Sequence, residues 1–170
     1  MNTKQEVLEN LLFADQYMEA MFPNVKKLTL VITGGASFLL KDFKDKVTLD
    51  IDTISELDED MLLYLESFSI NNGASAVTYL SNSYQERLEK VKGNFKVLDV
   101  YVLSNEDLVI SKIGRLSDDD LRDIHYTGIM DKVDFHLLSK LAEEISAKHR
   151  DFTYKWKYFL NYFGLTEEVA

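Results

Sequence analysis

The stretch LVITGGAS, residues 30–37, combines an unbroken apolar run with two consecutive glycines. Branched apolar side chains in a short run that ends at glycine predict a buried strand, which we extend over residues 27–33. After a glycine turn into a helix, backbone amides can approach a phosphate closely, and the helix N-terminus favours negative charge. The stretch therefore predicts a phosphate cradle at Gly34 and Gly35, with the Ser37 hydroxyl as a further contact.

A second motif, LDID at residues 49–52, lies in a predicted strand over residues 47–54. Side chains alternate between the faces of a strand, so Asp50 and Asp52 are expected on the same face, about 7 Å apart. Two carboxylates on one face repel each other, and a divalent cation between them would remove that repulsion. The alternative is that both carboxylates face water on a half-exposed sheet.

The composition limits which metal such a site could hold. The 170 residues include no cysteine and only three histidines, which excludes disulfides, thiolate metal sites and iron–sulfur clusters. A metal would therefore be held mainly by carboxylates, and oxygen ligands favour Mg²⁺ or Mn²⁺.

Periodicity along the rest of the chain predicts an α+β fold: a small mixed β-sheet with flanking helices, followed by a C-terminal helical region. Ser104 and Ser117 are each followed three residues later by an acid, which is typical of a helix start. We predict two parts, an α/β core over residues 1–103 and a helical region over residues 104–170 packed on it. The predicted helices cover residues 4–21, 36–43 and 57–68 and most of 104–163; the predicted strands cover residues 27–33, 47–54, 75–80 and 95–103.

The apolar strand, the Gly-Gly-x-Ser segment and the Asp-x-Asp strand together resemble the signature of the polymerase-β-type nucleotidyltransferase superfamily. The resemblance covers roughly residues 28–125. It is greatest to small bacterial nucleotidyltransferase-like proteins, including the toxin half of abortive-infection toxin–antitoxin pairs. It implies that Gly34, Gly35 and Ser37 hold a nucleoside triphosphate, and that Asp50 and Asp52 hold magnesium ions.

The resemblance also implies a third carboxylate on a later strand, acting as a metal ligand and as general base on the attacking hydroxyl. Asp99 is the best match, because it lies in the middle of the apolar segment 95–103, where an unpaired charge needs a reason. The alternative for Asp99 is an ion pair with a lysine or arginine at the margin of the sheet.

The segment after this strand resembles the superfamily's helix in which a lysine reaches the nucleotide. Lys112 matches that position, and Arg115 would lie on nearly the same face, so both are expected to bind nucleotide. Asp118 stands where the superfamily often has a lysine. For Asp120 and Asp123, helix capping and internal salt bridges are an equal alternative to function.

The net charge and the hydropathy of the chain limit the kinds of partner that it can bind. A formal net charge of −10 is incompatible with nonspecific DNA binding, which requires dense cationic contacts, whereas contact with a structured RNA stays open. No apolar run approaches the roughly 20 residues needed to cross a bilayer, so we expect a cytoplasmic protein without a membrane segment. In the aromatic segment 154–163, helical spacing favours core packing or a homo-oligomer contact over base stacking.

These observations predict a metal-dependent nucleotidyltransferase that moves a nucleoside monophosphate from a nucleoside triphosphate to an acceptor. The acceptor is left open between an RNA, a protein and a small molecule. The alternative is a catalytically weak binding or regulatory module of a toxin–antitoxin-like system, and a third is a structural α+β protein with a surface Asp-x-Asp.

Overall fold

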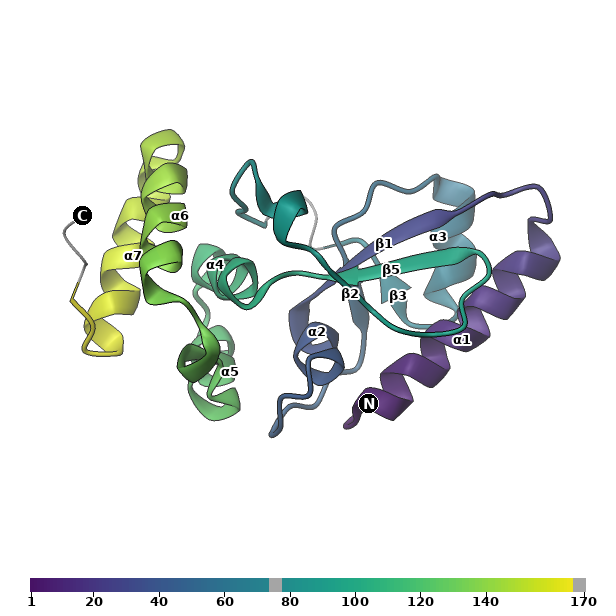
Figure 1. The fold of residues 1–170 in the computed structure, drawn as a ribbon, viewed down its shortest axis with the longest axis horizontal. Coiled ribbons are helices and arrows are strands. Elements are labelled where there is room, and N and C mark those ends of the chain that lie inside the picture. The colour runs from purple at the N-terminus through teal and green to yellow at the C-terminus, as the bar shows by residue number, and fades with distance from the viewer. Residues whose placement is uncertain (74–77, 167–170) are drawn as a thin grey trace. The chain divides into compact units, whose positions relative to one another are not determined.

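The computed structural model describes residues 1–73 and 78–166, and it confirms the predicted α+β class (Figure 1). The chain divides into two compact units: Met1–Ala76 with Leu88–Leu103, and Val77–Arg87 with Ser104–Ala170. The last passage of the chain from the first unit into the second follows Leu103. Residues 78–87, which the prediction assigned to the α/β core, group with the helices instead.

The first unit is a five-stranded mixed sheet with strand order β3-β2-β1-β5-β4. Strand β1 lies at its centre, parallel to β5 and antiparallel to β2, while β2 and β3 are parallel and β4 and β5 are antiparallel. Its helices and strands are α1 (Lys4–Met21), β1 (Leu28–Thr33), α2 (Gly34–Leu40), β2 (Ile51–Thr53), α3 (Glu59–Glu66), β3 (Ile70–Asn71), β4 (Glu89–Lys90) and β5 (Leu98–Val102).

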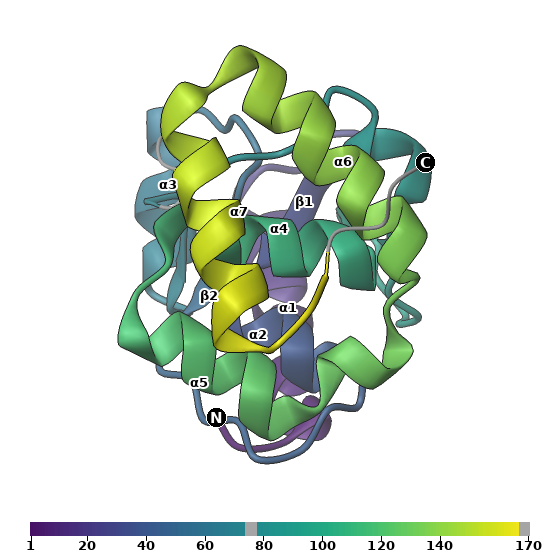
Figure 2. The same ribbon diagram turned by 90° about the vertical axis from the view of Figure 1, so that its left-hand side faces the viewer.

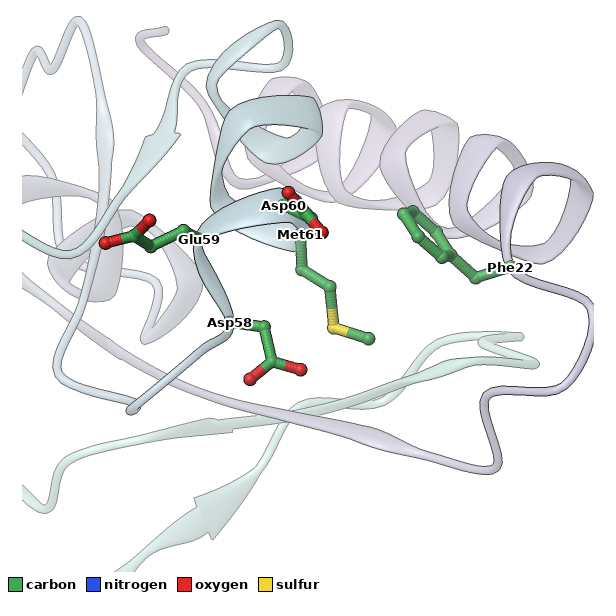
Figure 3. Close-up of a pocket in the computed structure, with 5 residues that line it drawn as sticks. All are labelled: Phe22, Asp58, Glu59, Asp60 and Met61. Atoms are coloured by element: carbon green, nitrogen blue, oxygen red, sulfur yellow. The ribbon is translucent and has the colours of Figure 1, made fainter.

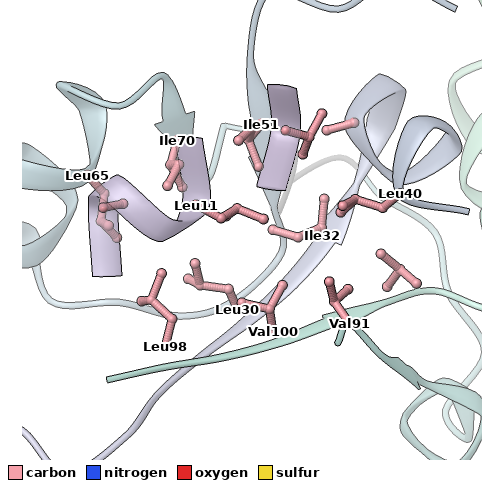
Figure 4. Close-up of a cluster of buried hydrophobic side chains, with 14 of the residues drawn as sticks. Leu11, Leu30, Ile32, Leu40, Ile51, Leu65, Ile70, Val91, Leu98 and Val100 are labelled. Atoms are coloured by element: carbon pink, nitrogen blue, oxygen red, sulfur yellow. The ribbon is translucent and has the colours of Figure 1, made fainter. Parts of the chain in front are cut away.

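One face of this sheet forms the hydrophobic core (Figure 4). Leu30 and Ile32 on β1 lie beside Val100 on β5, and Leu11 of α1 and Leu65 of α3 belong to the same buried cluster. Because side chains alternate along each strand, the residues between them point to the opposite face. That opposite face carries the polar groups considered below.

A buried carboxylate ties α1 to the start of β5. The side chain of Asp15 is 2% exposed and accepts hydrogen bonds from the backbone N–H groups of Lys96, Val97 and Leu98, the last two at 2.8 Å. Three amides directed at one carboxylate compensate for removing its charge from water.

Two of the predicted strands differ in the structure. The strand expected over 47–54 is limited to Ile51–Thr53, and the residues before it belong to a loop that includes positive φ angles at Asp42 and Asp45. Leu49, which strand alternation would place on the face opposite Asp50 and Asp52, is 82% exposed in this loop. Of the strand expected over 75–80, residues 75–77 lie outside the described part, and the remainder has no regular structure. The two-residue strands β3 and β4 were not predicted, since two residues show no periodicity.

The second unit is helical, as predicted, and α6 and α7 lie side by side (Figure 2). Both predicted helix starts are confirmed, because the Ser104 and Ser117 hydroxyls accept hydrogen bonds from the amides three residues later. Its elements are η1 (Tyr84–Arg87), α4 (Asn105–Arg115), α5 (Asp118–Thr127), η2 (Ile129–Lys132), α6 (Phe135–Lys148) and α7 (Arg150–Tyr162).

Helix α7 places its aromatic residues on two faces. Trp156, Phe159 and Leu160 are buried, as the core-packing prediction required. Tyr154 and Tyr158 are exposed. The homo-oligomer contact stays a prediction, and these two tyrosines are the residues that would make it. In the described part of the chain, no helix is both long and apolar enough to span a membrane.

Candidate functional site

The two glycines of the first motif form the turn between β1 and α2. Gly34 has φ +64°, a left-handed conformation that is unstrained only for glycine. The space around it is closed as well, since a Cβ on Gly34 would lie 2.5 Å from Asp52 Oδ2. The turn thus brings bare backbone directly against a carboxylate.

Strand register explains why Asp52 reaches this turn. Asp52 pairs with Thr33, the residue immediately before Gly34, and both lie on the face of the sheet opposite the core. The Asp52 side chain is half-buried there. Asp50 precedes β2 and is exposed, and its carbonyl oxygen accepts a hydrogen bond from Thr48 Oγ1 at 2.9 Å. The structure therefore places Asp52 at the glycine turn and Asp50 in the adjoining loop.

Two residues at this turn were missed by the sequence reasoning. A Cβ on Gly35 would lie 2.7 Å from Lys46 Cε and 2.8 Å from Thr48 Cβ, so these two side chains cover the second glycine. The backbone of Thr48 exchanges two hydrogen bonds with that of Met1, at 2.7 and 3.0 Å, which fixes the loop. The signal was available: Lys46 and Thr48 continue the every-second-residue pattern of Asp50 and Asp52.

Ser37 has a structural partner. Its side chain is fully buried, and its hydroxyl donates a hydrogen bond of 2.7 Å to the carbonyl oxygen of Gly34. This bond holds the first turn of α2 and uses the hydroxyl hydrogen. A phosphate contact from Ser37 stays a prediction.

Asp99 lies on the same face of the sheet as Asp52, but the two residues are at different positions along the strand direction. It pairs with Thr29, whereas Asp52 pairs with Thr33. Four residues along β1 correspond to about 13 Å. Asp99 Oδ2 accepts a hydrogen bond from the Tyr101 hydroxyl at 3.0 Å, and Oδ1 lies 3.5 Å from Lys90 Nζ. This is the lysine pairing that we gave as the alternative.

The strand register therefore does not bring three carboxylates together. Continuing the β1–β5 pairing by one residue would place Leu103, which is buried and apolar, level with Thr33. Across residues 1–73 and 78–166, no group of three histidine or acidic side chains is arranged to hold a metal ion. Of the predicted acids, Asp52 is the one that lies against the turn, beside Gly34.

Lys112 and Arg115, expected at the nucleotide, lie in the helical unit and contact acids there. Lys112 Nζ is 2.7 Å from Asp123 Oδ2 and 3.1 Å from Asp120 Oδ1, and the lysine is 5% exposed. Arg115 binds both carboxylate oxygens of Asp120, at 2.6 and 2.7 Å. Their role toward a nucleotide stays a prediction.

Asp120 is the centre of this polar network. Burial raises the pKa of its carboxyl, but the Arg115 hydrogen bonds, the Lys112 charge and the Ser117 contacts outweigh burial and hold the pKa well below its ordinary value. Ser117 and Asp120 also form a capping box for α5. The structure therefore shows Asp120 in the helix cap and the internal salt bridges that we gave as the alternative to a functional role.

The fold and the glycine–aspartate turn define a nucleotidyltransferase-like α+β protein. Comparison with known families gives a match over residues 9–168 to the family described as "Nucleotidyltransferase of unknown function (DUF6036)". Because the match covers most of the chain, the protein belongs to this family. Neither a curated protein nor a solved structure matches the chain.

Proposed function

We propose that the chain binds a nucleoside triphosphate at the Gly34–Gly35 turn and transfers its nucleoside monophosphate to an acceptor hydroxyl. The observation that supports this proposal is the pairing of opposite charges at the glycine turn: Asp52 lies against Gly34, and Lys46 lies against Gly35. A cation and close-approaching amides suit phosphate oxygens. The carboxylate beside them would help to hold a metal ion, which would supply further positive charge for the phosphate.

The donor set is compatible with magnesium or manganese in one specific way. Mg²⁺ is often bound by one or two protein carboxylates, with substrate phosphates and water completing its coordination. Asp50 and Asp52 would supply those carboxylates, and the triphosphate would supply the rest. When bound, the ion would neutralise charge that develops on the phosphate oxygens.

The chain's own residues would position the substrate. Lys46 would neutralise the triphosphate, the Gly34 and Gly35 amides would bind its oxygens, and Ser37 would hold the turn rigid. In the transfer, the acceptor oxygen forms a bond to the α-phosphorus, the bond from that phosphorus to the β-phosphate bridging oxygen breaks, and pyrophosphate leaves. The hydroxyl proton passes to water, because Asp99 lies about 13 Å along the sheet from the level of Asp52.

Calorimetric titration with each of the four triphosphates, in magnesium or manganese, tests the binding step. We expect Lys46→Met to weaken binding at least tenfold, as for a lost charge-assisted contact of about 1.4 kcal/mol. The matched control is Lys44→Met, which removes an exposed lysine from the same loop. Equal affinities of the two variants would refute the role of Lys46.

Label transfer tests the chemical step. Wild-type protein is incubated with α-labelled triphosphates and with total cellular RNA, protein or metabolites as the acceptor. Asp52→Asn should abolish labelling, while Asp42→Asn, which removes an exposed loop carboxylate, should retain it. Asp99→Asn should also retain labelling; a loss of 10²-fold or more would assign the base role to Asp99 despite the register.

The second candidate is a catalytically weak nucleotidyltransferase-fold module that regulates a partner, as in a toxin–antitoxin-like system. Two observations favour it: Asp99 and Asp52 lie at different levels of the sheet, and Lys112 is paired with two carboxylates. Triphosphate binding that depends on Lys46, with no labelling of any acceptor, would support this candidate over the enzyme.

A further inference from the structure

We infer that one surface of the first unit docks a basic, amphipathic segment of a partner protein. The α1–α3 surface, as we name it, comprises an exposed apolar row on α1 and an acidic cavity beside α3. Its residues are Phe13, Tyr17, Met21, Phe22, Asp58, Glu59, Asp60 and Met61. None of these residues takes part in the glycine turn, so the inference does not depend on the proposed function.

The apolar row consists of large side chains that the fold leaves exposed. Phe13 is 60% exposed, Met21 45% and Tyr17 38%, and the three follow one another at intervals of four residues. Residues four apart lie one above another on a helix, so the row extends about 12 Å along α1. A contiguous apolar row of this kind is typical of interaction sites, whereas scattered single residues are not.

Aromatic contacts connect this row to the cavity. The Tyr17 ring lies 5.8 Å from that of Tyr64, and the Tyr64 ring lies 5.3 Å from that of Phe22. Phe22 in turn lines a cavity of about 440 Å³, with Met61 on the other side of the opening (Figure 3). A partner side chain entering the cavity would therefore meet apolar groups continuous with the row on α1.

The rim of the cavity is acidic. Asp58, Glu59 and Asp60 are consecutive and exposed at the start of α3 (Figure 3). The surrounding sequence reinforces this charge, because no lysine or arginine occurs from residue 47 to residue 86. Charge complementarity therefore requires a partner that carries lysine or arginine beside its apolar side chains.

The same charge argues against other occupants. A second copy docked through this surface would bring its own acids against these acids. An anionic membrane or a nucleic acid would be repelled. A protein segment with apolar residues on one face and lysine or arginine on the other meets both requirements, as in helix-in-groove recognition.

Methionine-methyl NMR on the wild-type protein tests the location. The five methionines are Met1, Met18, Met21, Met61 and Met130, of which only Met21 and Met61 belong to the α1–α3 surface. The probe is an amphipathic leucine–lysine peptide of about 14 residues. We expect its addition to shift the methyl signals of Met21 and Met61 and leave that of Met130, in the helical unit, unchanged. Shifts of Met130 without those two would overturn the inference.

Fluorescence anisotropy with the same labelled peptide tests the chemistry. Phe13→Ser and Met61→Ser should each weaken binding about tenfold, the effect of losing a contact worth about 1.4 kcal/mol. Asp58→Asn combined with Asp60→Asn should weaken binding and reduce its salt dependence. The control Tyr154→Ser, at a 66% exposed tyrosine of the helical unit, should change affinity less than about twofold.

Four outcomes would contradict the proposal. Equal affinity for a scrambled peptide of the same composition would indicate charge attraction without a docking surface. Equal affinity for a leucine–glutamate peptide would show that the acidic rim plays no part in binding. Self-association that is lost in Phe13→Ser, or binding to anionic vesicles that is lost in the same variant, would assign the surface to a second copy or to a membrane. Circular dichroism of each variant verifies that it folds.

Discussion

Replacing Gly34 with alanine should destabilise the first unit by about 2–3 kcal/mol. The left-handed backbone at φ +64° would cost an alanine about 1–2 kcal/mol. The new Cβ would also lie 2.5 Å from Asp52 Oδ2, and rotating that carboxylate away would cost about 1 kcal/mol. Gly128→Ala is the matched control: its φ is +69°, but the nearest atom would be 3.7 Å away, so only the backbone cost applies.

Native-state hydrogen exchange measures both effects: the β1 amides report on Gly34→Ala in the first unit, and the α5 amides report on the Gly128→Ala control in the helical unit. In an Asp52→Ala background, Gly34→Ala should cost only the backbone part, leaving a coupling of about 1 kcal/mol between the two sites. Equal costs in both backgrounds would refute the close approach of Asp52 to the glycine turn.

Two further predictions concern buried carboxylates. Because Arg115 and its neighbours lower the folded-state pKa of Asp120, its contribution to stability should be complete above the ordinary value of 3.8 and be lost as the pH falls further. Asp120→Asn should therefore cost about 3 kcal/mol at neutral pH and flatten the acid limb, measured by Trp156 fluorescence; an unchanged pH profile would contradict this. Asp15→Asn should cost about 2 kcal/mol, since one amide oxygen replaces two carboxylate oxygens and an NH₂ group meets backbone donors. Faster exchange at Val97 with little change in the helical unit is the expected readout, and uniform exchange in both units would argue against a local role.

Patterns of medium range predicted much of this structure. The 18-residue helix α1, the strand ending at Gly34 and the serine caps of α4 and α5 are determined by neighbouring residues, so the sequence contains their signals. The glycine turn was also predictable, because only glycine accepts a left-handed turn with a side chain pressed against it.

Register and long-range pairing could not be predicted in the same way. Alternation put Asp99 on the correct face of its strand, but no local signal says that it pairs with Thr29 and not with a residue nearer Thr33. The three-amide environment of Asp15 depends on residues more than 80 positions away. Likewise, the ion pairs of Lys112 depend on the packing of α4 against α5, which helix periodicity alone does not specify.

The parallel pairing of β1 with β5 has a consequence for how the chain can be divided. The centre of the sheet requires residues 98–102, so synthesis must reach them before the first unit can complete its hydrogen bonding. A fragment that stops before Leu88 therefore lacks two of the five strands. A fragment that stops at Leu103 keeps the sheet but leaves Arg87 without Asp107, whose two oxygens it binds at 2.8 and 2.9 Å. Because the chain passes into the helical unit and back, no single cut yields both units intact.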